Sequence, residues 1–303
     1  MKFGKLPNIE DVDFSLPANH PLTDAVLEDP SPIDQPNFYN GCTGWSMKEW
    51  VGKIYPKGTK TKDYLSVYAQ HFNTIELNTT HYRIPTVETI DKWRKESTPD
   101  FRFCPKIPQT ISHSRDLGMG NQQLRVFWDV IAGLEEKLGC CFIQLPPHFS
   151  HQKLGILKQF LSIWPSSIPL AIEVRHESWF DQVQHTQDLL ETLQTYNKSA
   201  VITDVAGRRD VLHMGLTNAT TMIRFVGNGL HPSDYNRIDA WVERLTHWTQ
   251  QGLQEIYFFP HEPDNLLAPE MASYLHSKAQ MIPNIQTRGP KLIEPDPEQL
   301  SLF

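Results

Sequence analysis

The stretch PLAIEVRHESWF, residues 169–180, decides the fold class, because an apolar run ends there in a group of charged and aromatic side chains. A β-strand alternates its side chains between two faces, so Glu173 and Arg175 should share one face, with His176 and Trp179 on the turn beyond. Charged side chains on the inward face of a strand are costly unless they are paired or used. We therefore expect a buried strand that delivers chemistry at its carboxyl end.

Similar apolar runs lie on both sides of this stretch and alternate with segments of helical period. We expect further strands at residues 38–45, 74–78, 101–107, 140–145, 200–205, 221–226 and 255–259. Helices are expected at 60–72, 87–96, 122–138, 153–163, 182–196, 236–250 and 268–280, whereas 206–219 should be mostly loop. Eight strand–helix units within about 245 residues predict a (β/α)8 TIM barrel. An open doubly wound sheet is the alternative, but no glycine-rich phosphate fingerprint follows the first strand.

Composition divides the chain of 303 residues, 39% of them hydrophobic, into three parts. Residues 1–37 are rich in proline and carry seven acidic residues against two lysines, which predicts an irregular acidic arm. Residues 38–281 should form the barrel, and residues 282–303 an extended tail. The formal net charge of −7 argues against a broad attraction to DNA, although a local basic groove remains open as an alternative.

The cysteines and the hydropathy pattern indicate a cytoplasmic protein. Cys42, Cys104, Cys140 and Cys141 lie in apolar runs without CxxC spacing, which is typical of buried reduced thiols. No stretch approaches the roughly 18 apolar residues of a membrane span, and the chain starts without an apolar leader, so no membrane partner is expected.

Polar residues recur near the carboxyl ends of the predicted strands, where a barrel builds its active site. Any one of them could belong to a satisfied polar layer, but their convergence from separate strands favours a pocket. As catalytic candidates we take Glu173, Asp204 and His176. As substrate-binding candidates we take Glu76, Asn78, Tyr82, Lys106, His113, Gln144, Arg175, Trp179 and Arg224.

The residue types in this set permit two kinds of chemistry. If Glu173 lies near Asp204, one carboxyl should be pushed toward its protonated form, which would give an acid–base pair; if it lies beside Arg175, it should stay ionised. Arg175, Arg224 and Lys106 would suit a phosphate or carboxylate ligand. No HExxH or other compact ligand spacing is present, so no metal site is predicted, and no cofactor is indicated.

Residues 38–281 resemble the DUF72 family, also called the YecE-like family. The resemblance rests on several blocks in order: GCTGW at 41–45, FNTIELN at 72–78, YRIP at 82–85, FRF at 101–103 with Lys106, ISH at 111–113, QLPP at 144–147, EVRH at 173–176, SWF at 178–180, and Asp204. It implies a TIM-barrel fold and an activity that is generally described as unknown. One departure is FPHEP at 259–263, where the family usually has an asparagine-rich turn.

The last five residues, QLSLF at 299–303, resemble the peptide by which bacterial proteins dock on the DNA polymerase sliding clamp. Gln299 would supply hydrogen bonds, Leu300 completes the pattern, and Leu302 and Phe303 would be apolar anchors. The preceding segment, GPKLIEPDP at 289–297, should be an extended tether. A hydrophobic C-terminus that packs on its own barrel is the alternative.

Three hypotheses of function follow. The first is a barrel enzyme, hydrolase or lyase-like, that acts on a small anionic, phosphate- or sugar-containing substrate. The second is a DNA-maintenance factor recruited by the clamp, nuclease-like or DNA-binding. The third is a ligand-binding scaffold without catalysis, in which the strand-end carboxylates would all be consumed in internal salt bridges.

Overall fold

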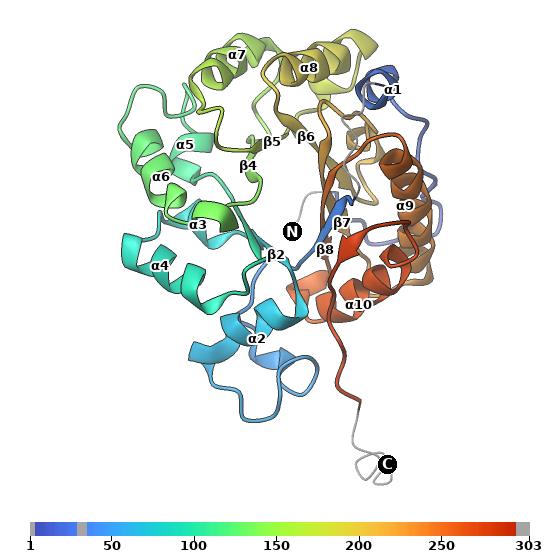
Figure 1. Ribbon diagram of the computed structural model, residues 1–303. Coiled ribbons are helices and arrows are strands. Elements are labelled where there is room, and N and C mark those ends of the chain that lie inside the picture. The colour runs from blue at the N-terminus through green and yellow to red at the C-terminus, as the bar shows by residue number, and fades with distance from the viewer. Residues whose placement is uncertain (1–3, 29–34, 295–303) are drawn as a thin grey trace.

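A computed structural model describes residues 4–28 and 35–294 of the chain (Figure 1). Within these ranges, short strands alternate with helices along the sequence, as the apolar pattern predicts. The strands are β1 Asn37–Asn40, β2 Thr74–Leu77, β3 Arg102–Pro105, β4 Cys141–Gln144, β5 Leu170–Glu173, β6 Ser199–Asp204, β7 Thr220–Val226, β8 Glu255–His261 and β9 Gln286–Thr287.

The strands are parallel and form an open sheet. One sheet has the order β4-β5-β6-β7-β8-β1-β9, and β2 pairs with β3 separately. The fold is therefore α/β with a parallel sheet, and the closed ladder of the expected barrel is not confirmed. Isolated backbone hydrogen bonds span the two breaks. Glu76 N donates to Cys42 O at 3.0 Å between β1 and β2. Between β3 and β4, Gly139 N donates to Phe103 O and Ile107 N donates to Phe142 O, each at 2.8 Å.

A side chain takes the place of ladder pairing between β1 and β2. The amide of Asn73 accepts from Asn40 N at 2.8 Å and donates to Phe38 O at 2.9 Å. Just beyond β1 the two backbones come so close that a Cβ on Gly41 would lie 2.2 Å from Thr74 O. Glycine is needed there because a side chain has no room.

Helices surround the strands on the outside (Figure 1). The helices are α1 Pro21–Leu27, α2 Tyr64–His71, α3 Thr79–Tyr82, α4 Val87–Glu96, α5 Gln109–Ser112, α6 Gln123–Ala132, α7 Leu154–Ile163, α8 Val183–Thr195, α9 Pro232–Gln250 and α10 Ala268–Ala279. Longer helices such as α6, α7 and α9 bury apolar side chains in the core, as amphipathic helices do. Residues 206–219 contain one 3-10 turn, Arg209–Val211, which agrees with the expected loop. None of the helices in the described ranges combines the length and the apolar character that a membrane crossing needs.

Side-chain alternation separates an inner cluster from the helix-facing core. The inner cluster is Tyr39, Cys104, Cys140, Phe142, Ala171, Val201, Met222, Tyr257 and Phe259. The outward residues of the same strands, such as Ile172, Ile223 and Phe258, pack against the helices. All four cysteines are free and buried, so they serve as small apolar side chains.

The N-terminal arm is more ordered than its composition predicts. Residues 21–27 form helix α1, whose Leu27 joins the core between the sheet and α9. The Thr23 hydroxyl donates to Met214 O at 2.8 Å and accepts from Leu216 N at 2.8 Å. At the other end of the described chain, β9 lies in the tail and pairs with β1.

Candidate functional site

Polar side chains continue the inner face of the sheet at its carboxyl end. All but Glu76 lie two residues beyond an inner-cluster residue of their own strand, so strand alternation points them to the same side. The set is Glu76, Lys106, Gln144, Glu173, Arg224 and His261, all buried except Gln144, which is half-buried. The sequence predicts that the first five lie together, and the structure joins all six through hydrogen bonds and ion pairs.

Arg224 is the centre of this set. Its Nε donates to Glu76 Oε2 at 2.8 Å, its Nη2 to Glu76 Oε1 at 2.8 Å, and its Nη1 to Glu173 Oε2 at 2.7 Å. The guanidinium is 1% exposed and the carboxylates 0% and 2%. Such charge-assisted, paired bonds fix both position and ionisation state. Arg224 therefore holds β2, β5 and β7 in register at their carboxyl ends.

The two carboxylates are held as anions. Burial alone would raise the pKa of Glu76, but Arg224 and His261 hold it well below its usual range. Burial would also raise the pKa of Glu173, but Arg175 and Arg224 outweigh it and lower the pKa to about 2. The Nε of Arg175 donates to Glu173 Oε1 at 3.0 Å. Glu173 thus positions two arginines and is a poor proton donor near neutral pH.

Gln144 links Glu173 to Lys106. Its Nε2 donates to Glu173 Oε2 at 2.7 Å, and its Oε1 accepts from Lys106 Nζ at 3.0 Å. Lys106 is 7% exposed, and no carboxylate in residues 4–28 and 35–294 lies within ion-pair distance of its ammonium. Burial, and then the nearby charge of Arg224, lower the pKa of Lys106 to about 8.

His261 ends β8 beside Glu76. Its Nε2 lies 2.9 Å from Glu76 Oε2. Burial lowers the pKa of His261 and Glu76 opposes this, with the net shift downward, so the ring is neutral at neutral pH. A neutral imidazole that donates its proton to Glu76 leaves the other ring nitrogen as an acceptor.

A cavity of about 670 Å³ opens above this polar layer. From the strand ends its wall includes Asn78, Lys106, Gln144, Arg224 and His261. Loops after the strands add residues such as His81, Tyr82, Asn228 and Glu262. The arm adds Gly4, Lys5, Leu6, Pro7 and Ile9. A cavity of this size fits a small ligand.

The arm is attached to the sheet beside the cavity. Gly207 N donates to Gly4 O at 2.8 Å, and a Cβ on Gly207 would lie 2.7 Å from that oxygen. The ring of Phe14 lies 4.8 Å from the Arg237 guanidinium, on which Phe225 also stacks at 4.1 Å. The arm therefore forms part of the cavity wall, a role its composition does not predict.

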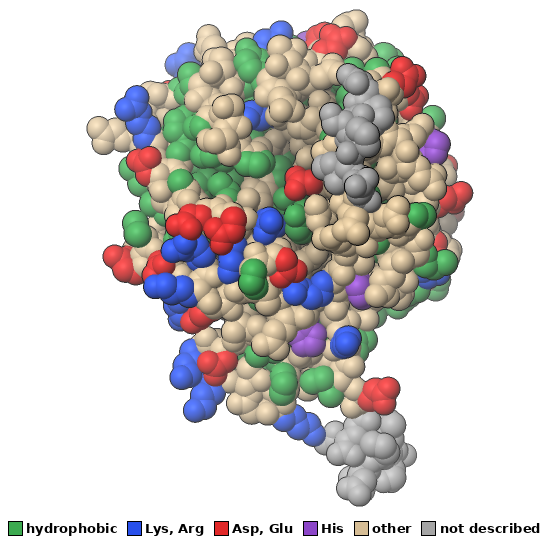
Figure 2. All heavy atoms as spheres, in the orientation of Figure 1, with side chains coloured by type: hydrophobic (Ala, Val, Ile, Leu, Met, Phe, Trp, Pro, Cys, Tyr) green, Lys and Arg blue, Asp and Glu red, His purple; other side chains and the backbone are tan. Residues whose placement is uncertain are grey.

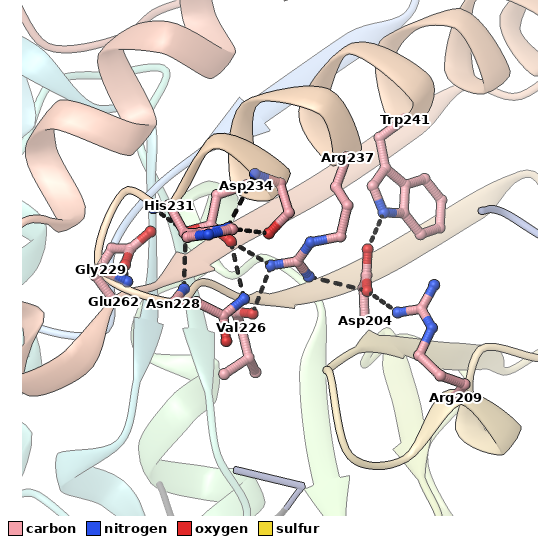
Figure 3. Close-up of polar contacts among 11 residues, drawn as sticks. Asp204, Arg209, Val226, Asn228, Gly229, His231, Asp234, Arg237, Trp241 and Glu262 are labelled. Carbon is pink, nitrogen blue, oxygen red and sulfur yellow. Dashed lines mark hydrogen bonds and ion pairs between the residues drawn. The ribbon is translucent and has the colours of Figure 1, made fainter. Parts of the chain in front are cut away.

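Asp204 does not join Glu173, contrary to one of the expected pairings. It lies three residues beyond the inward Val201, so alternation turns it toward α9. Figure 3 shows its carboxylate between Arg237, Arg209 and Trp241. Arg237 Nη1 donates to Asp204 Oδ1 at 3.0 Å, Trp241 Nε1 donates to Oδ2 at 2.8 Å, and Arg209 donates to Oδ1 as well.

The Asp204 cluster holds one loop of the cavity wall. Arg237 Nη2 donates to Asp234 Oδ1 at 2.7 Å. Asp234 in turn accepts from the backbone N of Asn228 at 2.8 Å and of His231 at 3.0 Å (Figure 3). Asp204 thus acts on the cavity indirectly, through the loop before α9.

The other candidates are dispersed. His176 accepts from Ser178 N at 3.1 Å and caps the 3-10 turn Glu177–Trp179. Trp179 is fully buried and donates to Phe149 O at 2.8 Å, so it is core and not a stacking wall. His113 is exposed beside Ser112, outside the cavity wall. Tyr82, which is 80% exposed, and Asn78 do line the cavity.

Glu262 is, like His261 and His81, a cavity residue that the candidate set omits. It is 5% exposed; its Oε2 accepts from Gly229 N at 2.9 Å, and its Oε1 has no hydrogen-bond partner among the described residues. Burial and Asp234 raise the pKa of Glu262 to about 7. A Cβ on Gly227 would lie 2.0 Å from Glu262 Oε1, so this carboxyl needs glycine opposite it. The only sequence signal is its place after His261, in the turn that departs from the family pattern.

In the part of the chain that the structure describes, no three His, Cys, Asp or Glu side chains are grouped as metal ligands would be. The clamp-like residues Gln299, Leu300, Leu302 and Phe303 lie outside the described residues.

Comparisons with known proteins give a family match over most of the chain. A family model described as "Protein of unknown function DUF72" matches residues 39–294. UPF0759 protein YecE of Escherichia coli (strain K12) is 31% identical over 285 residues, which cover 88% of this chain and 100% of that protein. UPF0759 protein YunF of Bacillus subtilis (strain 168) is 29% identical over 159 residues, or 50% of this chain and 55% of that protein.

Two solved structures share the fold. A DUF72 family protein from Enterococcus faecalis V583 has a TM-score of 0.65 at 21% identity, and the match covers 86% of this chain and 100% of that chain. A DUF72 family protein from Thermotoga maritima MSB8 has a TM-score of 0.56 at 23% identity, and the match covers 74% of this chain and 92% of that chain. At these identities the likeness bears on the fold alone.

Proposed function

Because the chain belongs to the DUF72 family, whose function is described as unknown, we propose a function from the site itself: the chain binds a small anionic ligand at the carboxyl end of its parallel sheet and acts on it as an enzyme. The ligand carries a carboxylate or a phosphate group.

The observation that carries this proposal is the charge balance of the polar layer. Among the described residues its network contains two carboxylates, Glu76 and Glu173, and three cations, Arg175, Arg224 and Lys106. The carboxylates are committed to arginines, whereas Lys106 reaches the cavity wall with only a neutral amide as acceptor. A buried cation without a counter-ion favours an anion that enters beside it.

Glu262 supports the enzymatic part of the proposal. A general acid–base works best when its pKa lies near the working pH, and the pKa of Glu262 is raised to about 7. Glu173 and Asp204 are consumed in internal ion pairs, as the scaffold hypothesis expects of strand-end carboxylates. Glu262 has no such partner in the described ranges, so in our proposal it replaces them as the proton-transfer residue.

Anion binding can be tested by calorimetry with inorganic phosphate and with malonate at pH 7. Lys106→Met should lower the affinity by roughly 10- to 100-fold, as the loss of a charge-assisted contact of about 1.5–3 kcal/mol predicts. It should remain folded, because removing an unpaired buried charge relieves its desolvation. Lys92→Met is the matched control, since Lys92 lies on α4 with its side chain 57% exposed. Equal affinities for both variants and the unaltered chain would refute the proposed site.

We further propose that the strands form an interrupted (β/α)8 barrel. The backbone bonds from Glu76 to Cys42 and from Ile107 to Phe142 support this, because they lie at the two places where the ladder is open. The convergence of side chains from β2, β3, β4, β5, β7 and β8 in one polar layer also fits a barrel mouth.

The sliding clamp remains a second proposal, and it rests on the peptide at 299–303. In the described part of the predicted tether, Gly289 and Pro290 are buried and Ile293 N donates to Lys53 O at 2.7 Å, so residues 289–293 lie along the body, while the side chains of residues 291–294 are exposed. Deleting residues 299–303 should abolish retention on immobilised sliding clamp, and replacing Ser301 by alanine should not. DNA is a weaker partner proposal, because basic and acidic side chains are interspersed on the face that Figure 2 shows.

A further inference from the structure

Lys106 has an environment that an ordinary structural lysine does not have. It follows β3 directly, is almost fully buried, and lies on the wall of the cavity. Lysines are rarely buried unless they are paired with a carboxylate. Here Nζ donates to Gln144 Oε1 at 3.0 Å, and the centre of the Phe142 ring lies 5.8 Å away.

This environment raises the fraction of uncharged amine, although the ammonium still predominates at pH 7 because the pKa of Lys106 is lowered only to about 8. Burial disfavours the ammonium most, the positive charge of Arg224 and, to a smaller extent, that of Arg175 act in the same direction, and Glu76 and Glu173 oppose them. A desolvated lysine beside another cation is one of the known ways to make an amine nucleophilic at neutral pH. Gln144 assists, since its Oε1 accepts a hydrogen bond from either form of the amine and keeps Nζ at the cavity wall.

We propose that Lys106 forms an imine with the carbonyl carbon of a small anionic carbonyl compound bound in the cavity. This inference rests on the proposed anion site and deepens it, because it names the substrate class: a carbonyl group close to a carboxylate or a phosphate. The arginines that flank Lys106 favour the anionic group, and the amine reacts with the carbonyl.

The steps balance without any oxidant or reductant. The lone pair of Nζ forms the C–N bond, the π electrons of the carbonyl move to its oxygen, and a proton passes from nitrogen to oxygen to give a carbinolamine. The C–O bond then breaks with addition of a proton, water leaves, and the nitrogen–carbon double bond forms. Glu262 on the same wall supplies the proton that leaves with water, and regains one when the imine is hydrolysed.

Reductive trapping tests the inference on the full chain. The protein is incubated at pH 7 with glyoxylate, or with glycolaldehyde phosphate, plus sodium cyanoborohydride, and modified lysines are located by peptide mass spectrometry. A pKa lower by about two units gives about 100-fold more neutral amine, partly offset by weaker nucleophilicity, so Lys106 should be labelled about tenfold faster than Lys92. The faster of the two probes shows whether the site prefers a carboxylate or a phosphate.

Two controls make the result decisive. Lys106→Arg keeps a cation and should lose the fast labelling while it still binds phosphate. Inorganic phosphate should slow the labelling of Lys106 and leave that of Lys92 unchanged. If phosphate binds at Lys106 but Lys106 is labelled no faster than Lys92, the imine is refuted and the anion site stands. If neither binding nor fast labelling occurs, both proposals fail. Fast labelling that phosphate does not slow also refutes the inference, because the amine would then react outside the anion site.

Discussion

Arg224 forms a two-pronged ion pair with Glu76, with Nε donating to Oε2 and Nη2 donating to Oε1, each at 2.8 Å. The two residues are 148 positions apart in sequence and come from β7 and β2. The pair crosses the interior at the carboxyl end of the sheet, and the third nitrogen of Arg224 reaches Glu173 on β5. The polar layer therefore holds three strands together and also forms the floor of a cavity.

Replacing Arg224 by methionine should destabilise the fold by about 3–5 kcal/mol, because buried Glu76 would lose its arginine partner and Glu173 would keep only Arg175. Urea unfolding at pH 7 measures this. Adding Glu76→Gln to Arg224→Met should recover part of the loss, since one of the unpaired charges is then removed. A double variant less stable than Arg224→Met would contradict the ion-pair account.

Acid should unfold the chain partly through Glu173. Its folded-state pKa of about 2 lies below its ordinary value of 4.5, so the ion pairs contribute stability above pH 4.5, and that contribution is lost as the pH falls toward 2. The contribution is about 3 kcal/mol at neutral pH. Glu173→Gln should therefore flatten the dependence of unfolding free energy on pH between 5 and 2.5. Glu177→Gln, at an exposed position nearby, should leave the dependence unchanged.

Anion affinity should fall as the pH rises through about 7. Below that value Glu262 is protonated and neutral, and above it the carboxylate repels an anion in the cavity. Lys106 adds a second fall near pH 8 as it loses its charge. Glu262→Gln should remove the first step and keep the second, which a series of titrations from pH 6 to 9 can resolve with sulfate, whose own charge does not change in this range. If the first step persists in the variant, another group titrates there.

Asp204→Asn should reduce stability and leave the anion site intact. It weakens a buried contact with Arg237 and Arg209, at a cost of about 2–4 kcal/mol. Phosphate affinity should change by less than about twofold, because a contact that the anion does not share contributes little to binding. An affinity loss as large as that of Lys106→Met would instead place Asp204 in the binding site.

The sequence places a strand residue correctly when apolar neighbours on the same strand show which face of the sheet its side chain lies on. Glu76, Lys106, Gln144, Glu173 and Arg224 converge because each follows the inward face of its strand. Asp204 also lies at a strand end, but it is three residues beyond the inward Val201, so its side chain points outward. Trp179 was expected near the site because it follows the strand closely, yet the turn buries it in the core.

Loop and arm residues could not be placed in the same way. Glu262 and His81 depend on where the loops fold back, and no periodic pattern fixes that. The arm reaches the cavity through contacts such as Gly4 with Gly207 and Phe14 with Arg237, which join residues about 200 positions apart. Such long-range contacts have no local sequence signal.

The arm also has a consequence for how this protein can diverge from its relatives. The family match begins at residue 39, whereas Lys5, Leu6, Pro7 and Ile9 form part of the cavity wall. The chain thus builds one cavity from two sources: strand ends within the shared family region and a segment that precedes it. Substitutions in residues 4–9 can reshape the entrance without disturbing Arg224 and its carboxylates. The shape of the cavity entrance and the charge of its floor can therefore change through substitutions at different positions of the chain.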